Sequence, residues 1–256
     1  MRVNLLGCYV DILTMAETVE CAKLAMRERK RVQHVALNVA KFVNMRTDSV
    51  LRADVMGSDV IGIDGMGILL ALRLFGAPVT NRVTGIDLCW EVLKVCGNDG
   101  FRPFLLGATP DVLAQASHVI AATFPSLQLA GMRDGYFRPE EEGDVVAQII
   151  NSNADCLFIA MPTPRKERFL AAYRDRLGVP FIMGVGGSLD VIAGQVRRAP
   201  AIMQSMGLEW LYRIYQEPRR MWWRYAKTNT LFAGILIRAV FDQYKVDARG
   251  LPRLGS

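Results

Sequence analysis

Residues Gly207–Tyr225 contain the side chains best suited to binding an anion beside an apolar surface. They include three of the four tryptophans and the arginines Arg213, Arg219, Arg220 and Arg224. A guanidinium can donate two hydrogen bonds to a phosphate or carboxylate, and tryptophan and tyrosine favour a membrane–water boundary. The segment therefore predicts binding of an anionic group next to lipid. A helix that buries its aromatic rings in the core and leaves its arginines in solvent explains the composition equally well.

Asp64 is the acidic residue whose position is most suggestive of a site. It follows the apolar run Val60–Ile63 and precedes Gly65 and Gly67. Glycines there let a ligand approach the backbone, and the carboxylate is exposed to that ligand. Asp is also a good N-cap for a following helix. The spacing alone favours Asp64 as an N-cap over Asp64 as a ligand-binding carboxylate.

The apolar pattern predicts strands that alternate with helices. Strands are expected near Val79 and at Val3–Leu6, Gln33–Leu37, Val60–Ile63, Phe101–Leu105, Leu127–Gly131, Cys156–Met161 and Phe181–Val185. Helices are expected at Thr14–Arg29, Val39–Met45, Gly65–Phe75, Thr84–Cys96, Pro110–Phe124, Glu140–Asn151 and Lys166–Arg176. This alternation indicates an α/β fold, a Rossmann-like, largely parallel sheet with helices on both faces. Ligands bind beyond the carboxyl ends of such strands.

The run from Gly184 through Gly186 to Asp190 also follows a predicted strand. Leu189 replaces the third glycine of a dinucleotide fingerprint, and the run lies late in the chain, so it is a weak signal for NAD. Backbone N–H groups at a helix start can bind a phosphate or a uridine. Asp190 is equally explained as an acidic residue in the first turn of a helix.

Composition limits the class of protein. The chain is 51% hydrophobic and 22% charged, which indicates a globular protein, and its net charge of +6 suits nucleic acid, anionic lipid or phosphorylated ligands. The five cysteines form no CxxC pair and the two histidines have no ligand-like spacing, so neither a zinc site nor a disulfide framework is expected. The longest late apolar run, Leu231–Phe241, is too short to span a membrane and contains Arg238.

Several motifs together resemble the WecG/TagA/CpsF glycosyltransferases, glycosyltransferase family 26. The strongest are Asp64-Gly65-Met66-Gly67 and the block that starts Gly207-Leu-Glu-Trp-Leu-Tyr-Arg and continues through Glu217-Pro-Arg-Arg to Arg224-Tyr225. The resemblance covers Val3 to Tyr225. It implies transfer of a sugar from a UDP-sugar to a polyprenyl-diphosphate-linked acceptor at the cytoplasmic face of the inner membrane.

The resemblance also implies roles for single residues. Asp64 would be the general base, in a pocket with Asn38 and Arg82; the family's usual threonine is Ala36 here. Lys166 replaces the family's glutamine, which leaves the identity of the donor open and is compatible with a contact to the diphosphate. The remaining substrate and nucleotide candidates are Gly65, Gly67, Thr84, Gly85, Asp87, Gly107, Gly135, Tyr136, Lys166, Glu167, Gly184, Gly186, Asp190 and Arg198.

We expect a catalytic domain over residues 1–200, a basic, aromatic helical appendage over 201–246 and a disordered tail over 247–256. The appendage would close over the pocket at an anionic membrane surface, with Arg213, Arg219, Arg220 and Arg224 on the diphosphate. Arg213 and Arg220 share a helix face only if the helix continues through Pro218. No D-x-D occurs, so we expect no cofactor and no obligatory metal. A homo-oligomer also fits the sequence, because it would cover apolar surface that is otherwise exposed when the protein is away from the membrane.

Two other functions fit parts of the sequence. A nucleotide-dependent oxidoreductase needs an early G-x-G-x-x-G after the first strand, and none is there. A non-catalytic basic module that binds nucleic acid or membrane would explain the charge, but not the polar residues and glycines at the strand ends. We therefore expect no nucleic-acid partner.

Overall fold

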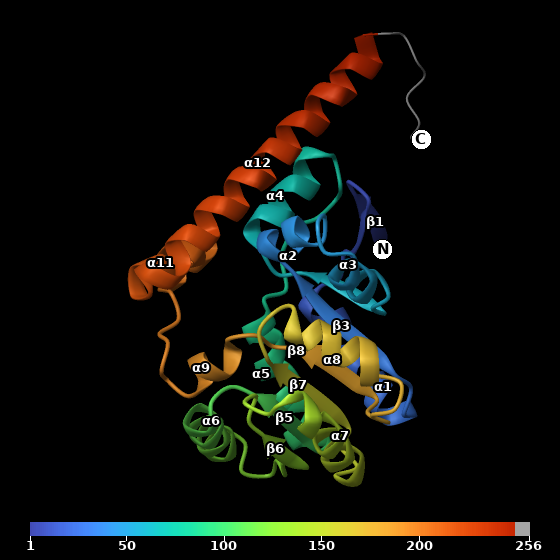
Figure 1. Cartoon of the computed structure of the whole chain (residues 1–256), viewed down its shortest axis with the longest axis vertical. Helices are drawn as coiled ribbons and strands as arrows, with labels where there is room; N and C mark the ends of the chain where they lie inside the picture. Colours follow the sequence, from blue (N-terminus) through green and yellow to red (C-terminus); the bar gives the residue numbers. More distant parts are fainter. Residues whose placement is uncertain (249–256) are drawn as a thin grey trace.

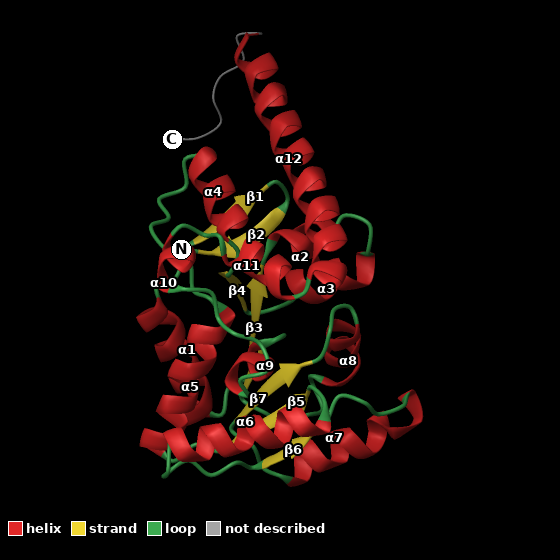
Figure 2. Ribbon diagram, turned by 90° about the vertical axis from the view of Figure 1, so that its left-hand side faces the viewer, coloured by secondary structure: helices red, strands yellow, loops and turns green. Residues whose placement is uncertain are grey.

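The computed structural model describes residues 1–248 and contains a six-stranded, fully parallel sheet in the order β4-β3-β8-β7-β5-β6 (Figures 1 and 2). Its strands are β3 (Val32–Leu37), β4 (Val60–Ile63), β5 (Pro103–Gly107), β6 (Gly131–Arg133), β7 (Cys156–Ala160) and β8 (Phe181–Gly184). The predicted fold class is confirmed. All six carboxyl ends meet at one edge, because every pairing is parallel.

Helices cover both faces of the sheet because the buried strands have apolar side chains on both sides. Leu157 and Ile159 of β7 pack with α7 (Glu142–Asn151) and α8 (Arg165–Tyr173). Phe158 and Ala160 point to the opposite face. That face is covered by α1 (Met15–Glu28), α5 (Gly85–Asp99), α6 (Pro110–Thr123) and α9 (Ser188–Ile192). A 3-10 turn, η1 (Pro139–Glu141), precedes α7.

The β3–β4 end of the sheet has a second core. It is formed with α2 (Val39–Asn44), α3 (Ser49–Met56), α4 (Met66–Leu74) and a hairpin of β1 (Arg2–Leu5) and β2 (Cys8–Asp11). The strand predicted at Val3–Leu6 therefore exists, but it pairs antiparallel in a separate two-stranded sheet. Leu6 and Gly7 both have positive φ and form the turn. Leucine is an unusual residue at a positive φ, so the hairpin could not be recognised from its turn residues.

Two other expectations were wrong. The strand expected near Val79 is an irregular segment, although Val83 N–H still donates to Ile63 O. The strand expected at Leu127–Gly131 begins only at Gly131. Helix α3 was not predicted at all, and the other helix ends agree with the prediction to within about three residues.

The C-terminal segment forms three helices, α10 (Ala201–Ser205), α11 (Glu209–Gln216) and α12 (Pro218–Ala248). Pro218 begins α12, where proline is favoured, so Arg213 and Arg220 belong to different helices. The tail expected to be disordered from Asp247 is still helical at Asp247 and Ala248; its residues 249–256 lie outside the described part. No helix within residues 1–248 combines the length and hydropathy needed to cross a bilayer.

Helix α12 packs on α2 and then projects beyond the rest of the chain (Figure 1). Its Phe232 side chain is 6% exposed and meets Phe42 of α2 edge to face, with ring centroids 5.4 Å apart. Because this ring fills a buried site, Phe232→Ala is expected to lower the unfolding free energy by about 3 kcal/mol. The matched variant Phe241→Ala, at a ring that is 63% exposed, should change it by less than about 0.5 kcal/mol. Chemical denaturation of both variants checks this, and equal losses would contradict the docking.

Candidate functional site

The predicted site residues of the sheet gather at its carboxyl edge. Asn38 follows β3, Asp64 follows β4, Gly107 ends β5, Gly135 follows β6 and Gly184 ends β8. The polar and glycine residues picked out from the sequence thus share one edge of the sheet, where such folds bind their ligands. Asn38 and Asp64 lie at its β3–β4 end, and Gly107 and Gly135 lie at its β5–β6 end.

The carboxylate of Asp64 does not cap α4, the helix that follows it. The N-cap of α4 is Gly65, without a side-chain cap. The Asp64 carboxylate instead accepts a hydrogen bond from Gly85 N–H at 2.9 Å, at the start of α5. The Asp64 turn lies against the first turn of α2, because a Cβ on Gly65 would lie 3.1 Å from Asn38 Cβ. Asn38 caps α2, its side-chain oxygen accepting from Lys41 N–H at 3.0 Å.

Arg82 joins the Asp64 turn to the C-terminal segment. Its guanidinium donates to Asp64 O at 3.1 Å and to Gln204 O at 3.3 Å, and it forms an ion pair with Glu209 on α11. The Arg82 side chain is 14% exposed. Glu209 was not singled out from the sequence, because only the fold brings an acid of the appendage to a strand-end arginine.

A second ion pair holds the start of α5. Arg198 binds Asp87 through two hydrogen bonds of 2.6 and 2.7 Å, and Thr84, the N-cap of α5, donates to the same carboxylate at 2.6 Å. Burial opposes ionisation of Asp87, but the hydrogen bonds from Arg198 and Thr84 outweigh it and lower the pKa of Asp87. The pair ties the loop after α9 to the segment that supplies Gly85.

The glycine turns after β5 and β6 meet beside β7. The chain continues from β5 to β6 in one direction along the sheet and from β7 to β8 in the other, which makes the β5–β7 boundary a topological switch point. Gly107 has φ +118°, and a Cβ there would lie 2.5 Å from the Ala160 carbonyl carbon. Gly135 is also tightly packed, because its Cβ would lie 3.1 Å from Gly107 Cα. These positions need glycine.

Arg165 fixes the turn that presents Tyr136. It donates to Gly135 O at 2.7 Å and to Phe137 O, and its guanidinium lies 4.4 Å from the centroid of the Phe137 ring. The Tyr136 side chain is 74% exposed. Arg165 was not singled out from the sequence, although it directly precedes Lys166.

Three charged residues are buried together behind this edge. Glu167 is fully buried and lies 3.2 Å from Lys166 Nζ and 3.5 Å from Lys41 Nζ. Burial opposes ionisation of Glu167, but the two lysines outweigh it and lower its pKa. Burial, reinforced by Lys166, lowers the pKa of Lys41 to about 8. Lys166 packs on Gly184, where a Cβ would lie 2.8 Å from its Nζ.

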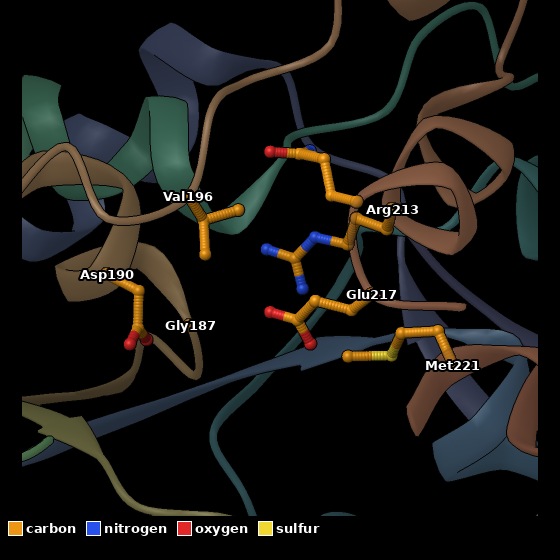
Figure 3. A pocket seen from close by; sticks show the side chains of 7 residues that line it. Gly187, Asp190, Val196, Arg213, Glu217 and Met221 are labelled. Carbon is orange, nitrogen blue, oxygen red and sulfur yellow. The ribbon is translucent and has the colours of Figure 1, made fainter. Parts of the chain in front are cut away.

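Arg213 reaches the glycine turn after β8. A Cβ on Gly187 would lie 3.5 Å from Arg213 Nη2 and 3.6 Å from Asp190 Oδ2. Figure 3 shows its guanidinium pointing into the space between Asp190 and Glu217. The cavity there is about 20 Å³ and is lined by Gly187, Asp190, Val196, Arg213, Gln216, Glu217 and Met221. This volume holds about one water molecule. Gly186, beside Gly187, has φ +52°.

Arg219 and Arg224 do not line this cavity. The side chains of Arg219 and Arg224 are exposed on the first turns of α12, and Arg224 lies 5.9 Å from the centroid of the Tyr225 ring. The side chain of Arg220 lies outside what the structure describes. Among residues 1–248, no three His, Cys, Asp or Glu side chains group as a metal site.

The sequence of the chain matches one known protein family over nearly its whole length. Residues 3–246 match the model of the glycosyl transferase WecG/TagA/CpsF family, nearly the whole chain. The chain belongs to this family. It is therefore a glycosyltransferase of cell-wall polysaccharide biosynthesis, and the family implies a nucleotide-sugar donor and a lipid-linked acceptor. The match includes α10 and α11 and most of α12, so the C-terminal helices belong to the family's shared architecture.

Proposed function

We propose that this glycosyltransferase moves a hexose from a UDP-sugar to a polyprenyl-diphosphate-linked saccharide, with inversion at the anomeric carbon. One observation carries the proposal. Arg82 binds both the Asp64 turn and Glu209 of α11, and Arg213 follows Glu209 by one helical turn. Asp64, the proposed base, and Arg213, the proposed diphosphate ligand, are thus linked through Arg82 and Glu209 although they lie far apart in the sequence.

In this mechanism, Asp64 takes the proton of the acceptor hydroxyl while that oxygen attacks the anomeric carbon. The bond to UDP breaks on the opposite face of the sugar. One displacement inverts the configuration, so an α-linked donor gives a β-linked product. The hydrogen bond from Gly85 N–H orients the Asp64 carboxylate, and arginines of the appendage stabilise the departing diphosphate. The donor sugar is N-acetylmannosamine, its uronic acid, or glucose.

The cavity at Arg213 suggests that α11 acts as a lid. A space for about one water cannot admit a diphosphate between Arg213 and the Gly186–Gly187 turn. Donor entry therefore requires α11 to move away, and return of Arg213 would exclude water from the bound diphosphate. Such a movement would break the Arg82–Glu209 ion pair and the two hydrogen bonds between Gln216 of α11 and the backbone of Arg197.

The exposed rings of the appendage support peripheral binding to the cytoplasmic face of an anionic membrane. Trp222 and Trp223 are 63% and 72% exposed, next to the exposed Arg219 and Arg224. The double variant Trp222→Ala/Trp223→Ala is expected to lose at least about tenfold in affinity for anionic vesicles, equivalent to about 1.4 kcal/mol. Sedimentation with vesicles measures this, with Tyr9→Ala as control at a half-exposed ring of the hairpin. Unchanged binding of the double variant would exclude the aromatic surface as the membrane contact.

The reaction itself is tested by a donor screen. The full-length protein is incubated with a synthetic polyprenyl-diphosphate sugar and each UDP-hexose in turn, with and without a chelator, and the anomeric configuration of the product is determined by NMR. We expect one donor to give a product of inverted configuration, at the same rate with chelator. Retention of configuration would contradict the single displacement, and loss of activity with chelator would contradict metal independence.

A further inference from the structure

The turn between α10 and α11 lies directly on the Asp64 turn. Gly207, in that connection, has φ +72°, and a Cβ there would overlap the side chain of Met66, the first residue of α4. Met66 follows Asp64 by two positions. A side chain at Gly207 would therefore push the start of α11 away from the Asp64 turn. The fit brings Glu209, the first residue of α11, to the same edge.

Arg82 is the side chain through which Glu209 reaches the Asp64 turn. Its guanidinium donates to the main-chain oxygens of Asp64 and of Gln204 in α10, at 3.1 and 3.3 Å, and it pairs with the Glu209 carboxylate. The Arg82 and Glu209 side chains are 14% and 24% exposed. A guanidinium this far from solvent needs an anionic partner, because loss of that partner leaves an uncompensated charge. The Glu209 carboxylate serves as such a partner, and it directs the guanidinium of Arg82 onto Asp64 O.

The other side of the Asp64 turn contains a group that reports its geometry. Gly85 N–H donates to the Asp64 carboxylate at 2.9 Å. Gly85 is the first residue of α5, and the N–H of a first helical residue has no acceptor within its own helix. The protection of this amide against exchange with solvent therefore depends on the Asp64 carboxylate, and it reports whether that carboxylate stays in place.

We propose that Glu209 is a positioning residue: through Arg82 it holds the Asp64 turn in the geometry needed for transfer, and it does so only while α11 is closed on the sheet. The inference rests on the proposed function, because it takes Asp64 as the base and α11 as the lid. Departure of α11 removes Glu209 from Arg82. The base is then fully ordered only when the diphosphate site is closed and water is excluded.

The kinetic test is Glu209→Gln, because the amide keeps the shape of the side chain and removes its charge. We expect kcat to fall by about 10- to 100-fold and the donor KM to stay within about twofold, because closure follows donor entry. Glu209→Asp keeps the charge and should restore kcat toward that of the unmodified chain. Glu91→Gln is the matched control. It removes the same charge from an exposed ion pair with Lys94 and should leave kcat unchanged.

A double-mutant cycle shows whether Glu209 acts through Arg82. If it does, Glu209→Gln should change kcat by less than about twofold once Arg82→Gln is present. Amide exchange at Gly85, followed by NMR, gives a second cycle with the same four proteins and without substrate. We expect exchange at Gly85 to be about tenfold faster in Glu209→Gln, and no faster in the double variant than in Arg82→Gln alone.

The outcomes separate this inference from the proposed function. Equal effects of Glu209→Gln with and without Arg82 would show that Glu209 acts elsewhere and would overturn the inference, as would unchanged exchange at Gly85. A donor screen without any transfer would reject the proposed function, whereas the exchange cycle would still decide whether Glu209 orders the Asp64 turn. Should thermal denaturation show that Glu209→Gln is unfolded, Glu209→Met takes its place in both cycles.

Discussion

Asp64→Asn is expected to lower the rate of sugar transfer by about 10²- to 10⁴-fold, the usual contribution of a general base. The substitution is conservative in structure, since the amide oxygen of Asn can still accept the hydrogen bond that Gly85 N–H gives to Asp64 at 2.9 Å. It removes only the ability to take a proton. Affinity for UDP should therefore change little.

Two measurements test this expectation. Single-turnover kinetics report the transfer step, and calorimetric titration with UDP reports binding. Asp111→Asn is the matched control, an exposed Asp in the first turn of α6, and should behave like the unmodified chain. Full activity of Asp64→Asn would reject Asp64 as the base. Loss of UDP binding together with activity would assign the residue to donor binding instead.

Arg213→Met should have the second largest effect. Arg213 is the one predicted diphosphate arginine that the described structure places against the Gly187 turn, whereas Arg219 and Arg224 are exposed on α12. Loss of a donor aimed at developing charge costs about 10²- to 10³-fold in kcat. The methionine keeps most of the apolar length of the side chain, so the contact of α11 with the sheet should persist.

The control for Arg213→Met is Arg238→Met, which removes the same charge from an 87% exposed side chain on α12. We expect kcat of the control to stay within about twofold, since exposed ion pairs contribute little. Steady-state kinetics with saturating donor and acceptor distinguish the two variants. Equal losses in both would show that appendage charge acts only by membrane attraction, and an active Arg213→Met would remove Arg213 from the leaving-group site.

The sheet could be predicted because its strands are buried on both faces. Runs such as Cys156–Ala160 and Phe181–Gly184 are apolar throughout, and each is flanked by Pro, Gly, Asn or Asp, which are typical of turns. The strand-end rule then placed Asn38, Asp64 and Gly107 on one edge without coordinates. The hairpin was missed because Leu6 adopts a positive φ that its residue type does not announce.

Contacts between distant segments could not be predicted in the same way. Spacing favoured Asp64 as the cap of the helix that follows it. Its carboxylate instead accepts a hydrogen bond from Gly85 N–H at the start of α5, which is 21 positions later in the sequence and is brought there only by the fold. Lys41 looks like an ordinary solvent-facing lysine of a short helix until Glu167, from the other half of the chain, pairs with it. Glu209 likewise acquires a role only through Arg82. Such pairs depend on the tertiary arrangement, which local patterns do not encode.

In the proposed function, the donor binds at the carboxyl edge of the sheet, between the strand-end turns and α11. Photo-crosslinking with a uracil-azido analogue of UDP, followed by peptide mapping, tests it directly. We predict labelled peptides from the Gly107, Gly135 and Gly184–Ser188 turns and from α11, with labelling competed by UDP. A hollow of about 450 Å³ beside α1 is lined by Glu17, Glu20 and Glu28 among others and reaches Val32 at the start of β3. Competed labelling of that hollow, with none at the carboxyl edge, would exclude the carboxyl edge as the donor site.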